Sequence, residues 1–516
     1  MQETVSLDKV TGANIGTSPL HTVEDLDRML AAARAAQPAW AALPVAERVK
    51  RLKQVRGYLI AHLDELATII ARDNGKTRID ALCAELLPAA FGISYYNRMA
   101  AKFLKDKPIR PSSIMMANKR SKIVRVPYGV IGVISPWNYP FAIPFSEVLM
   151  GLLAGNTVIL KTATETQQVG LALKRCFEAA GLPEGVFNFI NLPGRIAGEA
   201  FLEGGLDKLF FTGSVPVGKQ LMQKAGETLT PVSLELGGND AMLVCEDANL
   251  DLAVGGVLWA GFSNAGQSCG GVERIYVHRS VYQTFIDKLK VRTEALRVGY
   301  DSDFNVDMSC LTTAKQKAVV EEHVKDALAK GARIYAQSSA PEGGNFLPAM
   351  VLVDVNHEML TMREETFGPI VGVMPVDSMD EAIKLANDSQ LGLTGSVWTR
   401  DLKKGEALAR RIKAGAVTVN DHLMSHGLAE TPWGGFKESA IGRSHGEIGF
   451  EEMTQPQVIV KDYLIFANRG LWWHPYSKKV YMGLAGLLEA LYGQGLAKRL
   501  LGAVRLARIL PRILTK

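Results

Sequence analysis

Short β-rich runs and amphipathic helical runs alternate along most of this chain, and this alternation constrains its fold more than any other feature. A β-rich segment, KIVRVPYGVIGVI, occupies residues 122–134, and a helical pattern over Val169–Ala180 ends at the Gly-Leu-Pro of 181–183. Strands that alternate with helices predict parallel βαβ units. We therefore expect an α/β fold.

The expected strands form two groups along the chain. The first group comprises VIL (158–160), FNFI (187–190) and KLFFTG (208–213), the last of which is followed by a helix from Gly218. The second group comprises AMLV (241–244), RIYVH (274–278), IVGVM (370–374) and SVWT (396–399). A chain of 516 residues is too long for one small core. Two doubly wound domains are therefore predicted, with helices before them at Leu26–Pro38 and Val45–Asn74.

The positive charge of the chain is concentrated at its C-terminal end. Residues 466–516 contain nine Lys or Arg and one acidic residue, Glu489, so their net charge is +8. Because the whole chain has a net charge of +5, the remaining residues have a net charge of −3. The body is therefore near neutral, and the basic character belongs to this tail. Because the tail is rich in leucine and lacks aromatic residues along its basic side, we expect no nucleic-acid partner.

The last part of the tail has helical periodicity. Leucines and alanines form one stripe on a helical wheel, at Leu496, Leu500, Ala503, Ala507, Leu510 and Leu514. Lys498, Arg505 and Arg512 lie on the opposite side, and Pro511 should kink or end the helix.

This pattern favours a peripheral membrane helix in residues 470–516. The most apolar window, Met482–Ala497, is too short to span a bilayer and contains Glu489 and Gln494. We therefore expect an interfacial helix with Trp472 and Trp473 at the level of the lipid headgroups and the basic side toward anionic lipid. The alternative is a helical hairpin that packs on the protein or on a partner subunit.

The cysteine pattern indicates a reducing compartment. The five cysteines are scattered and form no CxxC pair, so neither a disulfide framework nor a zinc site is expected. The first residues lack the basic and apolar regions of a signal peptide, so we expect a location on the cytoplasmic side and no secretion. His422 and His426 are interpreted as loop residues, and no metal site is expected because no acidic or cysteine partner lies at ligand spacing.

Three residues are candidates for chemistry. Cys269, in FSNAGQSCGG, has small neighbours that let a carbonyl group approach its sulfur. Glu235, in LELGGND, ends an apolar strand, where burial would raise its pKa toward that of a general base. Asn138, in SPWNYPF, lies in a stiff turn and offers an amide donor for an oxyanion. Taken singly, each has an ordinary alternative: a buried cysteine, a paired glutamate or a turn asparagine.

A glycine turn at FFTGSVPVG (210–218) joins a strand to a helix. Gly213 and Gly218 allow a diphosphate to approach the start of that helix, where free N–H groups favour anions. The turn lacks the GxGxxG pattern, so it is a weak dinucleotide signal by itself.

Six motifs together give a more specific signal. SPWN, FTGSxxxG, LELGGN, GQxC, EExFGP and PWGGxKxSxxGR follow one another within roughly residues 10–458, with 34 residues from Glu235 to Cys269. In this order and spacing the chain resembles the aldehyde dehydrogenase superfamily. The resemblance implies that Cys269 attacks an aldehyde, that Asn138 and the Cys269 N–H hold the oxyanion, and that Glu235 activates water to release the acid.

The resemblance also implies a cofactor, a fold and an assembly. It implies NAD or NADP bound by residues at the following positions: Ser135, Pro136, Trp137, Lys161, Thr164, Thr212, Gly213, Ser214, Gly218, Leu236, Glu365 and Phe367. It implies two Rossmann-like domains, a small β arm and a homodimer or homotetramer. The expected boundaries are 1–107 and 128–236 for the cofactor-binding domain, 237–437 for the catalytic domain, 108–127 and 438–465 for the arm, and 466–516 for the tail.

Thr164 bears on the choice of cofactor. Many NAD-preferring members of the superfamily have a glutamate three residues after the lysine that Lys161 matches, and a glutamate there would repel a 2′-phosphate. Thr164 would not, so we expect that NADP is accepted. Glu165 leaves a preference for NAD open, because a shift of one residue would place an acidic side chain at the same contact.

The substrate is less constrained. Ser268 and Gly270 are small, and residues 419–435 resemble the fatty-aldehyde branch, so a medium- or long-chain aliphatic aldehyde is expected. A small polar semialdehyde is the alternative. A CoA-acylating enzyme is disfavoured because such enzymes usually lack a carboxylate at the Glu235 position, and a non-catalytic structural protein is disfavoured by the intact Cys269, Glu235 and Asn138.

Overall fold

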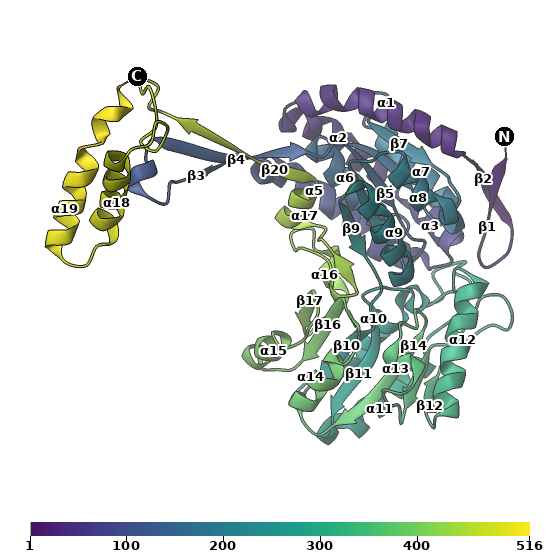
Figure 1. Ribbon diagram of the computed structural model, residues 1–516. Helices are drawn as coiled ribbons and strands as arrows, with labels where there is room; N and C mark the ends of the chain where they lie inside the picture. Colours follow the sequence, from purple (N-terminus) through teal and green to yellow (C-terminus); the bar gives the residue numbers. More distant parts are fainter. Residues whose placement is uncertain (1, 516) are drawn as a thin grey trace. The chain divides into compact units, whose positions relative to one another are not determined.

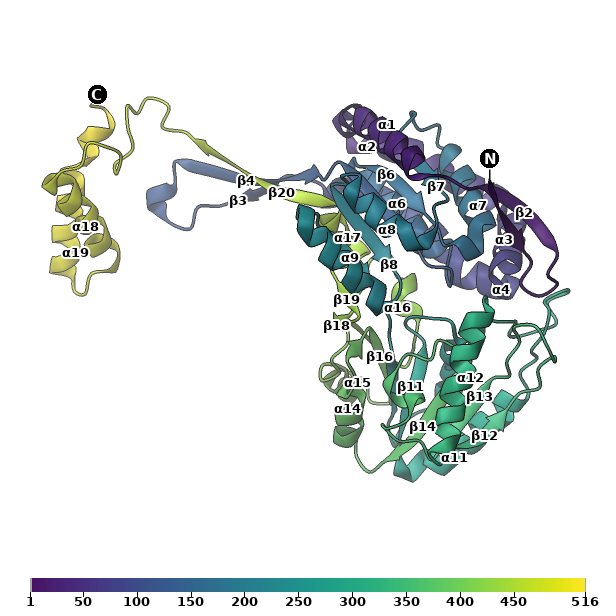
Figure 2. The ribbon, with the colours of Figure 1, turned by 45° about the vertical axis from the view of Figure 1, so that its right-hand side comes forward.

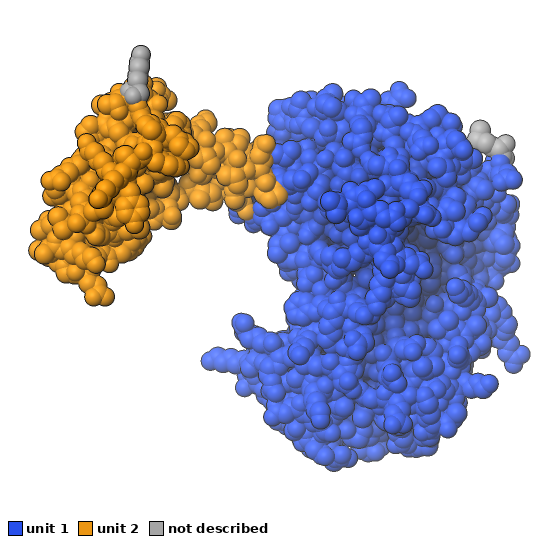
Figure 3. Space-filling model, viewed as in Figure 1, with its two compact units in different colours: residues 1–105, 125–455 blue, residues 106–124, 456–516 orange. Residues whose placement is uncertain are grey.

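The computed structural model describes residues 2–515, which form two compact units (Figure 3). The first unit contains residues 1–105 and 125–455, and the second contains residues 106–124 and 456–516. The predicted α/β fold is confirmed in the first unit, which holds two mostly parallel sheets.

The first sheet has the strand order β19-β9-β8-β5-β6-β7. Neighbouring strands are parallel, except that β19 is antiparallel to β9. The strands are β5 (Val130–Ile134), β6 (Thr157–Lys161), β7 (Phe187–Ile190), β8 (Lys208–Thr212), β9 (Val232–Glu235) and β19 (Ala440–Ile441). The predicted strands at 158–160, 187–190 and 208–213 are confirmed to within one residue at each end.

Both faces of this sheet are covered by helices (Figure 1). In β5, Ile131 and Val133 enter one core, and Val130 and Ile134 enter the other, because successive side chains of a strand point to opposite faces. The first core contains α2 (Val45–Ala61), α3 (Leu63–Asn74), α5 (Leu87–Phe103), α6 (Ala142–Ala154) and α7 (Gln167–Glu178). The second contains α1 (Val23–Ala42), α8 (Gly194–Glu203) and α9 (Val215–Thr228).

Two helix predictions need correction. The single helix expected over Val45–Asn74 is two helices, because the chain leaves helical geometry at His62, where φ is −113° and ψ is 24°. The helix expected from Gly218 begins at Val215, because Pro216 is tolerated in a first helical turn, where its missing N–H would have no partner. Ser214 is therefore the residue just before this helix.

The second sheet has the order β12-β13-β14-β11-β10-β16-β17, parallel except for β12. Its strands are β10 (Asp240–Val244), β11 (Val272–His278), β12 (Arg333–Gln337), β13 (Met350–Val353), β14 (Ile370–Val376), β16 (Thr394–Trp398) and β17 (Ala416–Val419). Its helices are α10 (Leu250–Phe262), α11 (Arg279–Glu294), α12 (Ala314–Ala329), α13 (Leu360–Arg363), α14 (Met379–Asn387) and α15 (Leu402–Ala409). The second group of predicted strands is thereby confirmed.

Shorter elements complete the first unit. The hairpin of β1 (Glu3–Leu7) and β2 (Asn14–Pro19) packs on α3 and α7 (Figure 2). The others are α4 (Arg78–Ala81), the π-helical turn η1 (Leu82–Leu86), β15 (Leu391–Gly392), α16 (Met424–Gly427), β18 (Phe436–Lys437) and α17 (Gly446–Glu452).

The second unit combines a small sheet with a helical hairpin. The sheet has the order β20-β4-β3, from β3 (Lys107–Ile109), β4 (Lys119–Pro127) and β20 (Thr454–Asp462). The hairpin consists of α18 (Lys478–Tyr492) and α19 (Leu496–Ala507). A Cβ added at Gly502 would lie 2.5 Å from the Gly486 carbonyl oxygen, so glycine lets the two helices approach closely. None of the helices within residues 2–515 is long and apolar enough to span a bilayer.

The predicted apolar stripe on the tail helix is confirmed, and it faces solvent. Leu496 is 74% exposed and Leu500 is 58% exposed. On the basic side, Arg505 pairs with Glu489 of α18 at 2.7 Å and Arg512 donates to the Trp473 carbonyl, whereas Lys498 is exposed. The hairpin therefore satisfies two of these three cations internally and leaves its leucines uncovered.

We expect Gly502→Val to separate the two tail helices, because its side chain would collide with backbone atoms of α18. Amide hydrogen exchange in Lys478–Tyr492 should become faster. Ala503→Val, at the exposed neighbouring position, serves as the control and should leave exchange unchanged. Equal exchange in the two variants would show that the helices do not depend on this close approach.

Candidate active site

Three cavities share one residue, Cys269. The first cavity, about 720 Å³ including its mouth, runs between α6, α10 and α16. The second, about 1220 Å³, lies at the carboxyl ends of β8 and β9. The third, about 360 Å³, contains Glu235. A sulfur atom at this junction can be reached from three directions, which suits a reaction of a substrate, a cofactor and water.

The chain before Cys269 is held in an unusual backbone conformation. Asn264 and Ala265 both have φ of 52°, and Gly266 has φ of 71°. Residues other than glycine cost about 1–3 kcal/mol each in such conformations, so the surrounding contacts must impose them. A Cβ at Gly266 would lie 2.1 Å from the Gly368 carbonyl oxygen, so only glycine fits there.

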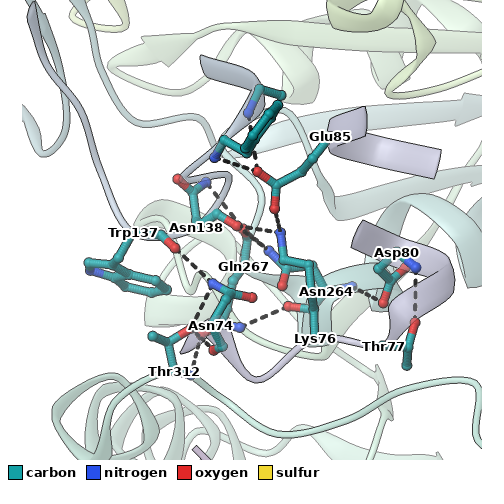
Figure 4. Close-up of polar contacts among 12 residues, drawn as sticks. Asn74, Lys76, Thr77, Asp80, Glu85, Trp137, Asn138, Asn264, Gln267 and Thr312 are labelled. Carbon is teal, nitrogen blue, oxygen red and sulfur yellow. Dashed lines mark hydrogen bonds and ion pairs between the residues drawn. The ribbon is translucent and has the colours of Figure 1, made fainter. Parts of the chain in front are cut away.

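A buried polar network imposes this conformation (Figure 4). The Asn264 side-chain amide donates to the carbonyl oxygens of Asn138 at 2.9 Å and Gln267 at 3.1 Å. Gln267 donates back to the Asn264 carbonyl at 2.9 Å and accepts from the Thr312 N–H at 2.9 Å. The segment that carries the nucleophile is thereby tied to the turn that carries Asn138.

An ion pair lies beneath that turn. Lys76 Nζ and Glu85 Oε1 are 2.6 Å apart, and both side chains are fully buried. Lys76 also donates to the Asn138 carbonyl at 2.8 Å, and Glu85 Oε2 accepts from the Phe141 N–H at 2.6 Å. Burial lowers the pKa of Lys76, and the charge of Glu85 opposes this effect. The ion pair therefore holds the turn at two points, the Asn138 carbonyl and the Phe141 N–H.

Asn138 itself is 3% exposed and lies beside the nucleophile segment. Its Nδ2 donates to the Gln267 carbonyl at 3.2 Å, and its Oδ1 has no hydrogen-bond partner. An amide held this firmly next to Cys269 can serve as an oxyanion donor.

The surroundings of Cys269 favour the neutral thiol over the thiolate. Burial raises its pKa far above the usual value, and the carboxyl groups of Glu365 and Glu235 raise it further. The thiol therefore needs a base, or a positive charge brought by a ligand, before it becomes a nucleophile.

Glu235 ends β9 and lines the third cavity with Cys269. Burial raises its pKa well above the usual value and Glu147 raises it further, whereas Arg443 and a hydrogen bond with Trp433 lower it. Its Oε2 has no partner. A Cβ at Gly434 would lie 2.9 Å from Oε1, so this glycine makes room for the carboxyl group. A buried carboxyl with a raised pKa and a free oxygen is suited to general-base catalysis.

The second cavity brings together most of the residues predicted to bind the cofactor. Its wall includes Pro136, Trp137, Thr212, Gly213, Ser214, Leu236, Glu365 and Phe367. Four predicted residues are absent from the wall, namely Ser135, Lys161 and Gly218, which are buried, and Thr164, which is exposed. Five further wall residues were not predicted from the sequence, because their places depend on the tertiary fold: Gly237, Thr313, Lys315, Gln316 and Val319. Glu165, the alternative to Thr164, also lies in the wall.

This cavity fits a dinucleotide. Gly213 and Ser214 line it at the start of α9, where the free N–H groups of a helix favour a diphosphate. The buried Thr212 Oγ1 at the same place has no hydrogen-bond partner. Glu365 is anchored by the Gly238 N–H at 2.9 Å, and a Cβ at Gly237 would collide with this carboxyl group. The cavity can therefore hold an elongated phosphate-containing cofactor, and Cys269 lies in its wall.

Glu165, rather than Thr164, faces this cavity. The 3-10 turn Thr164–Thr166 carries Thr164 to the surface. Burial lowers the pKa of Lys161, and the carboxylate of Glu165 opposes part of this effect. The position of Thr164 therefore gives no support to the argument for NADP.

The two histidines interpreted as loop residues have different surroundings. His426 lies in the short helix α16 and not in a loop, which corrects that prediction. His422 is buried, contacts Ser396 Oγ at 2.7 Å and lies 3.1 Å from the Gly270 carbonyl oxygen. Burial lowers its pKa to about 4, so the neutral ring donates to this carbonyl and supports the residue after the nucleophile.

The comparisons with known proteins identify the family. The model of the aldehyde dehydrogenase family matches residues 2–459. The chain is 37% identical to a 4,4'-diapolycopene aldehyde oxidase of a Methylomonas species over 494 residues, which covers 96% of this chain and 92% of that protein. It is 39% identical to a putative succinate-semialdehyde dehydrogenase [NADP(+)] of Mycolicibacterium smegmatis over 452 residues, which covers 87% of each chain.

Solved structures agree. An aldehyde dehydrogenase from Brucella melitensis biovar abortus 2308 matches with a TM-score of 0.85 and 32% identity, covering 90% of this chain and 94% of that one. The NAD+ complex of an aldehyde dehydrogenase from Bacillus cereus matches with a TM-score of 0.85 and 32% identity, covering 89% and 93%. The chain belongs to the aldehyde dehydrogenase family. It is an oxidoreductase that acts on aldehydes and has the fold of that family.

We expect Lys76→Met to lower the free energy of unfolding by about 3–5 kcal/mol, because it leaves Glu85 buried and unpaired. Chemical denaturation measures this change. Lys290→Met, in the exposed pair with Glu294, is the control and should change stability by less than about 1 kcal/mol. If both variants lower the free energy of unfolding by similar amounts, the buried pair contributes no more to stability than an exposed pair.

Proposed function

We propose that this enzyme oxidises a medium- or long-chain apolar aldehyde to the carboxylic acid with NAD or NADP. In this proposal Cys269 forms a thioester, and water activated by Glu235 hydrolyses it. The observation that carries the proposal is the position of Cys269 in the walls of three separate cavities, with Glu235 in one of them.

The steps follow from these positions. The Cys269 thiol gives its proton to solvent as its sulfur adds to the aldehyde carbon, and the resulting oxyanion accepts hydrogen bonds from the Asn138 amide and the Cys269 N–H. The nicotinamide cofactor, when bound in the second cavity, supplies the acceptor for the hydride that leaves this carbon. The carbon is thereby oxidised by two electrons, and a thioester remains. Water then adds, Glu235 takes its proton, and the C–S bond breaks to release the acid.

Hydrolysis is favoured over transfer to CoA by the surroundings of Glu235. Its carboxyl group is buried and has a free oxygen in a cavity that also touches Cys269. A base in this position serves water, whereas a thiol acceptor such as CoA needs no such group.

The wall of the first cavity supports an apolar substrate. Within residues 2–515 it contains no lysine or arginine, and its one carboxyl group is that of Asp80. Trp259, Met424, Leu423, Ile143 and Pro88 contribute apolar surface. A semialdehyde would place its own carboxylate here without a cation to pair with, which is unfavourable.

One relative supports the same choice. The match to 4,4'-diapolycopene aldehyde oxidase covers 96% of this chain, whereas the match to the putative succinate-semialdehyde dehydrogenase covers 87%. The relative that shares more of the chain is thus the one named as an oxidase of 4,4'-diapolycopene aldehyde. For the cofactor we propose both NAD and NADP, since relatives are named for NADP or were solved with NAD+.

We also propose that the tail hairpin binds an anionic membrane surface. Leu496, Leu500, Leu510 and Leu514 are exposed on one stripe, and Trp472 and Trp473 are 41% and 58% exposed. The exposed cations Lys478, Lys479, Lys498 and Arg508 would add about 1 kcal/mol each near anionic lipid. An apolar substrate dissolved in the bilayer would then lie close to the enzyme.

A homodimer or homotetramer is proposed through the small sheet of the second unit. Strand β20 is an edge strand, and Val458 and Val460 on it are 61% and 56% exposed. An unpaired edge with exposed β-branched residues is a template for pairing with a second copy.

The hydrolytic step is tested by Glu235→Gln. We expect a burst of NADH or NADPH equal to the enzyme concentration, followed by turnover slowed by about 10²–10⁴-fold, because the base acts after hydride transfer. Cys269→Ala should give neither burst nor turnover. A Glu235→Gln variant with normal turnover would rule out this base.

The substrate class is tested with aldehydes of two to sixteen carbons. Each buried methylene contributes about 0.8 kcal/mol, so kcat/KM should rise roughly fourfold per carbon until the first cavity is filled. Succinate semialdehyde should be a poorer substrate than an uncharged aldehyde of equal length. A preference for the semialdehyde would contradict the apolar assignment.

Membrane binding is tested by sedimentation with vesicles. The full chain should bind phosphatidylcholine vesicles that contain phosphatidylserine, and Leu496→Asp with Leu500→Asp should abolish binding. Leu402→Asp, at an exposed leucine of the first unit, is the control and should bind normally. If the double variant instead changes only the oligomeric state, the stripe contacts a second copy and not lipid.

A further inference from the structure

The third cavity holds more ionisable groups than the proposed hydrolysis uses. Beside Glu235 and Cys269 it is lined by Glu147 of α6, by His426 of α16, and by Ser444 and His445 before α17. Thr212 at the end of β8 and Trp433 also face it. The charged groups that act on it from outside the wall are Arg443 and Glu452.

Several of these groups lack the hydrogen bonds that buried polar atoms normally have. Glu147 is 3% exposed, and its Oε2 has no partner, like Oε2 of Glu235. His445 is 4% exposed, and its Nδ1 has no partner either. The His445 and His426 rings lie edge to face with centroids 4.9 Å apart. Buried groups left open toward one cavity need a ligand or water to satisfy them.

Hydrolysis creates a need for these groups. Each turnover delivers the proton of the attacking water to Glu235, which is buried and must lose that proton before the next cycle. Burial raises the pKa of Glu147 to about 8, and the charge of Glu147 raises the pKa of Glu235. Two interacting carboxyl groups in one cavity therefore share protons and titrate as a pair.

Building on the proposed hydrolysis, we propose that Glu147 is a positioning residue that shares a proton with Glu235 through water in this cavity. Atoms balance in this relay. Glu235 gives its proton to the Glu147 carboxyl, and Glu147 releases its own to water. Burial and the neighbouring His426 hold the pKa of His445 well below its usual range, so this ring does not take the proton.

The test compares Glu147→Gln with the wild-type enzyme during decay of the acyl enzyme that follows the NADH burst. Gln has the same shape but cannot accept a proton, so decay should slow about 10- to 100-fold while the burst persists. The pH profile of decay should show two ionisations in the wild type and one in Glu147→Gln. Glu147→Asp, which keeps the carboxyl group, should restore both. Glu178→Gln, an exposed change on α7, is the control and should decay normally.

Unchanged decay and an unchanged pH profile in Glu147→Gln would overturn the proposal. If that variant does not fold, a proton inventory of acyl-enzyme decay in the wild type gives the answer. A curved dependence on deuterium content, from several protons in flight, supports the relay, and a linear one overturns it. Glu235→Gln separates the two proposals. Normal turnover of Glu235→Gln would refute the role of Glu235 as hydrolytic base. Slow turnover of Glu235→Gln together with normal turnover of Glu147→Gln would refute only the relay.

Discussion

The buried ion pair of Lys76 and Glu85 is the interaction on which the active site depends. Lys76 holds the Asn138 carbonyl, Glu85 holds the N–H groups that begin α6, and Asn264 ties the same turn to the nucleophile segment. Two charges in a dry interior are costly unless each is paired and fully hydrogen-bonded. Here they are, and the resulting geometry sets the oxyanion donor beside Cys269.

The same rigidity explains how the nucleophile segment tolerates strain. Asn264 and Ala265 keep left-handed conformations because the Asn264 amide has two carbonyl acceptors and its own N–H donates to Asp80. Glycines remove the remaining collisions, as at Gly238, where a Cβ would lie 2.1 Å from the Cys269 carbonyl oxygen. Cys269 is thus presented to three cavities by a framework that belongs to both sheets.

The sequence predicted the parts of this site that depend on local order. The strands came from periodicity, and Cys269, Glu235 and Asn138 came from six ordered motifs; the structure places all three around the shared junction. What it did not predict depends on contacts between distant residues. Lys76 and Asn138 are 62 residues apart, and Glu147 faces His445 across a cavity that no local pattern reveals. The sequence left the choice between Thr164 and Glu165 open, and the 3-10 turn Thr164–Thr166 places Glu165 in the wall.

The tail shows the same limit. The apolar stripe of α19 could be predicted from a helical wheel. Which side of α19 faces solvent could not, because that depends on the neighbouring helix, where Glu489 pairs with Arg505. The leucines are left uncovered as a result. This exposed stripe and the cation-free first cavity both favour an apolar aldehyde.

We propose that the acyl group is carried on Cys269 and released by water at Glu235. Mass spectrometry of Glu235→Gln, quenched in acid after mixing with NAD+ and a long-chain aldehyde, tests it most directly. The peptide containing Cys269 should gain one acyl group in place of the thiol hydrogen. An acyl group on another residue, or an unmodified Cys269 while NADH accumulates, would contradict it.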